Sequence, residues 1–176
     1  MKIVKDKKGL TLVEMLVCVI TLLMVGAICA TGTGISIKSY QESRFESNSQ
    51  MLQSSIETVL SDILRYASNV TTTSEGVVDS FDNLDYGMIA GTVMISPSEE
   101  GSTEKRFVIK RYAGASEMLM LSHNAYAGDL YVDDFKLEYN SGTNVFSGSY
   151  TIKSKTMSND YVKHCSFYYR TIMDKN

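Results

Sequence analysis

The chain has 176 residues, of which 17 are lysine or arginine and 20 are aspartate or glutamate, giving a formal net charge of −3. This length is enough for one domain and one long helix. The acidic balance argues against nonspecific nucleic-acid binding, which depends on neutralising phosphate groups, and we expect no specific nucleic-acid partner.

The chain begins with a short basic leader, residues 1–9, which ends at Gly9 and precedes an apolar segment over residues 10–37. The segment is longer than the about 20 apolar residues needed to span a bilayer. Its single charged residue is Glu14. A carboxylate costs roughly 2.5–3.5 kcal/mol within a membrane span, so the sequence indicates a partner or a specific purpose for Glu14.

The leader, Gly9, the Leu-Thr-Leu-Val-Glu sequence of residues 10–14 and the apolar run together resemble the class III leader of type IV pilins and related pseudopilins. The resemblance implies that a prepilin peptidase cuts between Gly9 and Leu10. It also implies N-methylation of the new terminal residue, Leu10. Glu14 would then pair with the terminal amine of a neighbouring subunit and set the register of assembly. Many members of the family have phenylalanine where this chain has Leu10.

Three other classes of targeting or membrane segment fit these residues less well. A secretory signal peptide has an apolar core of about 7–15 residues, and this run is longer. A lipoprotein signal needs a small residue before the modified cysteine, whereas Val17 precedes Cys18 and Ile28 precedes Cys29. A plain membrane anchor fits the length but leaves Gly9 and Glu14 unexplained.

The apolar segment also contains Gly26, Gly32 and Gly34, the last two within a Thr-Gly-Thr-Gly sequence. Glycine disfavours helix interiors by about 1 kcal/mol. Many pilins have a proline in this part of the helix, but the only proline of this chain is Pro97. We therefore predict that Gly32 and Gly34 allow local unwinding during assembly; close helix packing is the alternative.

The helix is predicted to continue in amphipathic form over residues 38–68. Apolar residues recur there at spacings of three and four, which favours one buried stripe. The stripe consists of Leu52, Ile56, Val59, Leu60, Ile63, Leu64 and Ala67. Within this part of the helix, residues 59–69 resemble the matching region of J-type or W-type minor pilins.

Residues 69–176 are predicted to form an antiparallel β head. Residues 69–85 are polar and are predicted to be a loop, in which a cation site at Asp79, Asp82 and Asp85 is disfavoured because the spacing lacks the glycine turn of a calcium loop. After residue 85, several segments alternate apolar and polar residues, as expected for β-strands. Phe135, for example, should face one side of the sheet and Lys136 the other. The predicted strands are residues 86–95, 107–112, 118–122, 130–139, 145–153 and 161–170.

The sequence contains no pattern typical of a catalytic or metal site. His123 and His164 are isolated, and Cys165 should point to the opposite face of its strand from His164. Cys165 is surrounded by aromatic residues and is predicted to be a buried thiol. We therefore expect no enzymatic activity, no cofactor and no metal.

The predicted fold class is α+β: a long N-terminal α-helix, first transmembrane and then amphipathic, packed on an antiparallel β-sheet head. The resemblance implies a structural subunit of a type IV pilus or pseudopilus. Its implied partners are other pilin subunits, the prepilin peptidase and a membrane assembly platform. The protein would cross the cytoplasmic membrane once, with the head outside, and then enter an extracellular fibre. The alternatives are a low-abundance tip subunit that binds a surface, DNA or a secreted substrate, and a plain membrane-anchored β domain.

Overall fold

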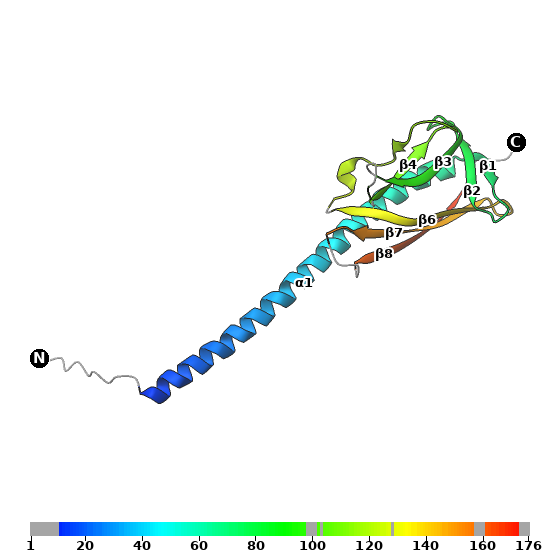
Figure 1. Ribbon diagram of the computed structural model, residues 1–176. Helices are drawn as coiled ribbons and strands as arrows, with labels where there is room; N and C mark the ends of the chain where they lie inside the picture. Colours follow the sequence, from blue (N-terminus) through cyan, green and yellow to red (C-terminus); the bar gives the residue numbers. More distant parts are fainter. Residues whose placement is uncertain (1–10, 98–101, 103, 128, 157–160, 173–176) are drawn as a thin grey trace, which may run out of the picture. The chain divides into compact units, whose positions relative to one another are not determined.

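The computed structural model describes residues 11–97, 102, 104–127, 129–156 and 161–172. One helix, α1 (Leu12–Arg65), is followed by two antiparallel β-sheets (Figure 1). The chain divides into two compact units between Ser43 and Arg44. The predicted α+β class, with a long N-terminal helix and an antiparallel sheet head, is confirmed.

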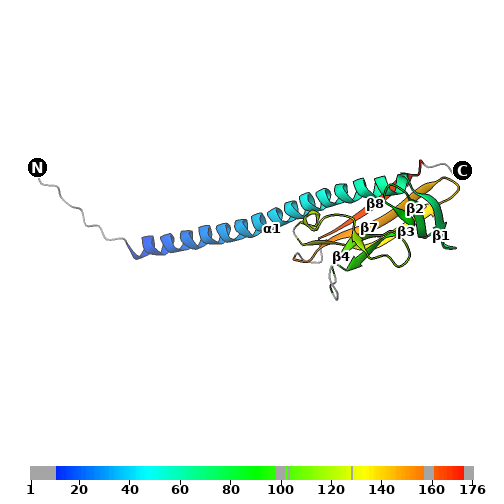
Figure 2. The ribbon, with the colours of Figure 1, turned by 90° about the horizontal axis from the view of Figure 1, so that it is seen from above.

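Helix α1 was predicted over residues 10–68 and is observed from Leu12 to Arg65. From Phe45 onward, every third or fourth residue is buried, which confirms the predicted apolar stripe. Figure 2 shows both sheets on one side of this part of α1. The buried residues of α1 are Phe45, Ser49, Leu52, Ile56, Leu60, Ile63 and Leu64.

Tertiary hydrogen bonds complete the C-terminal end of α1. The last carbonyls of a helix have no partner within the helix. Here the Ile63 carbonyl accepts a bond from the buried side-chain amide of Asn83, over 2.7 Å. The Arg65 carbonyl accepts bonds from the backbone N–H of Ile172, over 2.8 Å, and from the Thr171 hydroxyl. The two residues that follow the last strand therefore hold the end of the helix.

The first sheet has five strands in the order β1-β2-β3-β4-β5, and the second has three in the order β6-β7-β8. Both are antiparallel meanders. Within the described part of the chain, one isolated bridge, between Val77 and Glu138, joins them. The strands are β1 (Ser68–Thr72), β2 (Val78–Asn83), β3 (Met88–Pro97), β4 (Lys105–Lys110), β5 (Met118–Leu119), β6 (Leu130–Asn140), β7 (Val145–Ser154) and β8 (Val162–Arg170).

The six predicted strands are confirmed as β3 to β8, with β5 reduced to two residues. The prediction of a loop over residues 69–85 is wrong, because β1 and β2 lie there. Polar pairing stabilises these strands: the Asn69 amide donates to Asp82 over 2.8 Å, and the hydroxyls of Thr71 and Ser80 lie 2.8 Å apart. The predicted antiparallel head consists of two sheets.

Strand β6 confirms the predicted alternation and adds one irregularity. Leu137 and Tyr139 are buried, whereas Lys136 and Glu138 are exposed. A register shift in the pairing with β7 falls between Asp133 and Lys136. The extra residue of a β-bulge reverses the side-chain phase, so Leu130 and Val132 are buried on the even positions before it.

The core is formed by aromatic side chains from both sheets under the stripe of α1. Phe107 of β4 makes edge-to-face contacts with Phe135 and Tyr150, at centroid distances of 4.9 and 5.4 Å. Cys165 is buried, as predicted, and His164 is exposed on the opposite face of β8. Asp133 of β6 adds an ionic connection, because Lys105 of β4 and Lys153 of β7 each contact one of its carboxylate oxygens.

Candidate functional site

The candidate site is the N-terminal end of α1. The predicted cleavage point between Gly9 and Leu10, and the predicted methylation of Leu10, lie outside the described residues. The description begins at Thr11, directly before the first residue of α1. Glu14 lies in the first turn of the helix.

Thr11 and Glu14 form a reciprocal set of hydrogen bonds. Oε2 of Glu14 accepts bonds from the backbone N–H of Thr11, over 2.8 Å, and from its hydroxyl, over 2.9 Å. The backbone N–H of Glu14 donates in turn to the Thr11 hydroxyl, over 3.2 Å. This is the capping-box arrangement, which satisfies N–H groups that lack a partner at the start of a helix.

The capping box gives Glu14 a structural role that the sequence analysis missed. The signal was present, because a threonine followed three residues later by a glutamate before an apolar run is typical of a helix N-terminus. A carboxylate in the first turn also interacts favourably with the helix dipole. The predicted pairing of Glu14 with a terminal amine stays a prediction.

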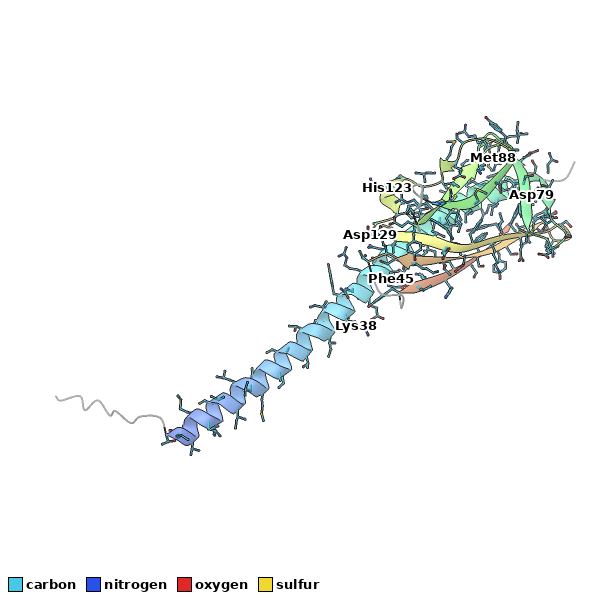
Figure 3. All side chains as sticks on the ribbon, in the orientation of Figure 1. Lys38, Phe45, Asp79, Met88, His123 and Asp129 are labelled. Atoms are coloured by element: carbon cyan, nitrogen blue, oxygen red, sulfur yellow. The ribbon has the colours of Figure 1, made fainter. Side chains whose placement is uncertain are left out.

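The apolar segment that follows forms a fully exposed helical surface. Side chains project from α1 on all sides before Lys38 (Figure 3). By length and composition alone, α1 is able to cross a membrane, although such a helix near an N-terminus is weak support for a membrane span. The large exposed hydrophobic residues here are Leu12, Val13, Met15, Leu16, Val17, Val19, Ile20, Leu22, Leu23, Met24, Val25, Ile28, Ile35 and Ile37.

Hydroxyl groups in this segment bond to their own helix. Thr21 donates to the carbonyl of Val17, over 2.9 Å, and Thr31 donates to that of Ala27, over 3.1 Å. Thr33 and Ser36 bond to preceding carbonyls in the same way. Serine and threonine within helices commonly bond backward like this. The donor of each of these hydroxyls is therefore satisfied without a neighbouring chain.

Gly32 and Gly34 lie within the continuous helix in this structure. A Cβ added at either position, or at Gly26, would meet nothing within 4 Å. The glycines thus make no close contact that requires their small size within this chain. Their predicted unwinding during assembly stays a prediction.

The three aspartates considered for a cation site have separate environments. Asp82 uses both carboxylate oxygens, accepting from the Ala90 N–H over 2.7 Å and from the Asn69 amide over 2.8 Å. These bonds, led by the one from Ala90, lower the pKa of Asp82. Asp79 and Asp85 are exposed. Within the described residues, no group of three histidine, cysteine, aspartate or glutamate side chains is placed to hold a metal ion.

His123 is not isolated, contrary to the sequence prediction. Arg106 donates to Nδ1 of its ring, because a guanidinium has no acceptor. The same guanidinium lies 5.2 Å from the ring centroid of Tyr126, whose hydroxyl accepts the Phe107 N–H over 3.0 Å. These contacts connect the short helix η1 (His123–Ala125) to β4. They give His123 an anchoring role.

Cys165 lies beside Tyr150 on the paired strands β7 and β8, and both side chains are buried. Burial raises the pKa of the Cys165 thiol and that of the Tyr150 hydroxyl. A thiol with a raised pKa stays protonated near neutral pH and is a poor nucleophile. Cys165 is therefore a packing residue.

Comparison of the chain with protein-family models, with curated proteins and with solved structures finds no match in any of the three.

Proposed function

We propose that this chain is a structural subunit of a type IV pilus or a related pseudopilus. It would be cut by a prepilin peptidase after Gly9, methylated at Leu10 and assembled through its N-terminal helix. Its partners would be other subunits of the fibre and a membrane assembly platform. Before assembly it would reside in the cytoplasmic membrane with the head outside, and afterwards in an extracellular fibre. This role needs no cofactor and no catalytic residue.

One observation carries the proposal: the first part of α1 is apolar and exposed, whereas its second part is buried along one stripe. Up to Ile37 its large apolar side chains are exposed, and from Phe45 it is buried along one stripe under the sheets. An apolar helix without an intramolecular partner needs a membrane or other helices to cover it. A subunit that moves from a membrane into a helical fibre meets both requirements in turn.

The leader and Glu14 support the same proposal from the sequence. Residues 1–9 carry four lysines and one aspartate, a net +3, so a chain cut after Gly9 would have a net charge of −6. Basic residues beside a span favour the cytoplasmic side. A new amine at Leu10 would lie four residues from Glu14, on the same helix face.

A second candidate is a low-abundance tip or minor subunit whose head binds a partner. It is favoured by an open groove in the head, lined by residues of β2, β3 and β6. The two candidates share the same leader. They differ in where the subunit lies along the fibre.

The test is mass spectrometry of the N-terminus of the protein, in membranes and in fibres sheared from the cell surface. We expect a methylated Leu10 terminus in both fractions. The ratio of the Leu10-terminus signal in fibres to that in membranes, compared with the total fibre mass, separates a major subunit from a rare one. An intact Met1 in sheared material, or a terminus near Gly32, would contradict the proposal.

A matched pair of variants tests the cut itself. Gly9→Val places a branched side chain at the proposed cleavage point and should leave Met1 intact, without fibre incorporation. Ile3→Val changes the leader conservatively away from Gly9 and should be cut normally. Equal processing of the two variants would argue for a plain membrane anchor.

A further inference from the structure

The groove of the head, here called the inter-sheet groove, lies where β2 leaves β3 and approaches β6. Its volume is about 610 Å³, within the usual range for ligand sites. β2 pairs with β3 from Asn83 to Phe81 only, whereas on its other side it pairs with β1 from Asp82 to Val78. Figure 1 shows β2 running from β3 toward β6.

One wall of the inter-sheet groove is an open edge of β3. Residues Thr92–Met94 line the groove and pair with β4 on their other side. Beyond Gly91, β3 has no pairing with β2 among the described residues. Alternate backbone N–H and C=O groups of this stretch therefore face the groove without a strand partner.

The opposite wall is the edge of β6. The Tyr139 N–H points away from β7 and donates to the Gly76 carbonyl, over 3.0 Å. Because backbone groups alternate along a strand, the Leu137 N–H points the same way. Leu137 lines the groove. The segment at Gly76 and Val77 therefore already occupies this edge of β6. The free strand edge in the groove is that of β3, beside which an added strand could lie.

The charges around the inter-sheet groove are unbalanced. Glu75, Asp79 and Glu138 line it, and Lys136 is the only cation among its lining residues. None of these three carboxylates forms an ion pair with another described residue. Val77 and Phe135 add apolar surface between the carboxylates. The lining therefore favours a ligand that alternates apolar and basic side chains.

We propose that the inter-sheet groove binds an extended basic segment of a partner protein as an added β-strand. Backbone hydrogen bonds to the edge of β3 would supply affinity, as in other cases of strand addition. The carboxylates would select lysine or arginine. This inference does not depend on the proposed role in a fibre, since it concerns the head alone.

The test uses the full-length protein in detergent micelles and a fluorescent heptapeptide, acetyl-Lys-Val-Lys-Val-Lys-Val-Lys-amide, titrated to about 1 mM at low salt. We expect saturable binding by anisotropy and chemical-shift changes at the amides of Thr92–Met94. Two control peptides share the sequence pattern. One replaces each lysine with glutamate, and the other carries an N-methyl group on every residue, which removes the backbone donors from both edges of the peptide.

Charge-reversal variants locate the binding. Asp79→Lys and Glu138→Lys should each lower the affinity for the lysine peptide by about two- to fivefold, the range for exposed ion pairs. Asp85→Lys makes the same change in net charge outside the groove and should leave binding unchanged. The proposal is overturned if the glutamate or N-methylated peptide binds equally well, if Asp85→Lys has the same effect, or if no binding is seen.

Discussion

One carboxylate oxygen of Glu14, Oε2, accepts both the backbone N–H and the hydroxyl of Thr11. Glu14 therefore has two separable properties, its capping geometry and its charge. A glutamine side chain retains an oxygen for the capping box but carries no charge. Substitutions at these two positions can distinguish helix capping from assembly.

We predict that Glu14→Gln blocks incorporation into fibres as fully as Glu14→Ala does, while both variants still insert into the membrane. The reason is that only a charged carboxylate can neutralise the amine of a neighbouring Leu10. Fibre yield is measured by immunoblotting of sheared surface material, with membrane fractions as the reference.

Thr11→Val is the matched control, because it removes the capping hydroxyl and retains the charge of Glu14. It should weaken the helix start by about 0.5–2 kcal/mol and still allow incorporation. If Glu14→Gln forms fibres normally while Thr11→Val does not, Glu14 acts as a helix cap and its charge has no role in assembly.

The predicted unwinding near Gly32 is testable by hydrogen exchange of the full chain in micelles. Amides around Thr33 should exchange faster than those around Thr21. Gly32→Ala should slow this exchange by about fivefold, because alanine favours the helix by about 1 kcal/mol and its Cβ meets no atom within 4 Å. Gly26→Ala should not affect exchange at Thr33. Uniform exchange along the segment would favour the helix-packing alternative.

The ion pairs of Asp133 should make the head sensitive to acid. The hydrogen bond from Lys105, followed by that from Lys153, lowers the pKa of Asp133 from 3.8 to about 2. A group whose pKa is lower in the folded state stabilises the fold above its unfolded pKa. This contribution is lost as the pH falls from about 4 to about 2.

Asp133→Asn should therefore reduce the free energy of unfolding by about 1–2 kcal/mol at pH 7, and the difference from wild type should shrink toward pH 2. Urea denaturation of the full chain in micelles, followed by tyrosine fluorescence, measures the free energy of unfolding of the variant and of wild type at each pH. Glu138→Gln is the control, since Glu138 lies exposed on the same strand without an ion pair. A difference that does not depend on pH would contradict the assigned role.

Asn83 should be one of the most sensitive polar residues of the head. Its amide donates to the Ile63 carbonyl, and its side-chain oxygen accepts the Tyr86 N–H over 3.2 Å. Asn83→Ala leaves both backbone groups without a partner and should lower the unfolding free energy by about 2–3 kcal/mol. Asn140→Ala removes similar bonds at an exposed turn and should cost under about 1 kcal/mol.

Periodicity in the sequence was enough to predict α1 and the strands from β3 to β8. It failed at β1 and β2, whose residues are mostly polar, because polar pairing between these two strands stabilises them without apolar alternation. The capping box could have been found from its threonine and glutamate. The inter-sheet groove could not, since it arises where β2 separates from β3, and register between distant strands has no local signal.

The backward hydrogen bonds of Thr21, Thr31, Thr33 and Ser36 have a consequence for any partner of this helix. With these hydroxyl hydrogens already donated, the segment offers a neighbouring helix mainly apolar packing. The ridges of one helix fit the grooves of another at repeated offsets, so such packing holds helices together without selecting one register. A filament built on such helices would be cohesive, and a few charged residues near its axis would have to select the register of each helix.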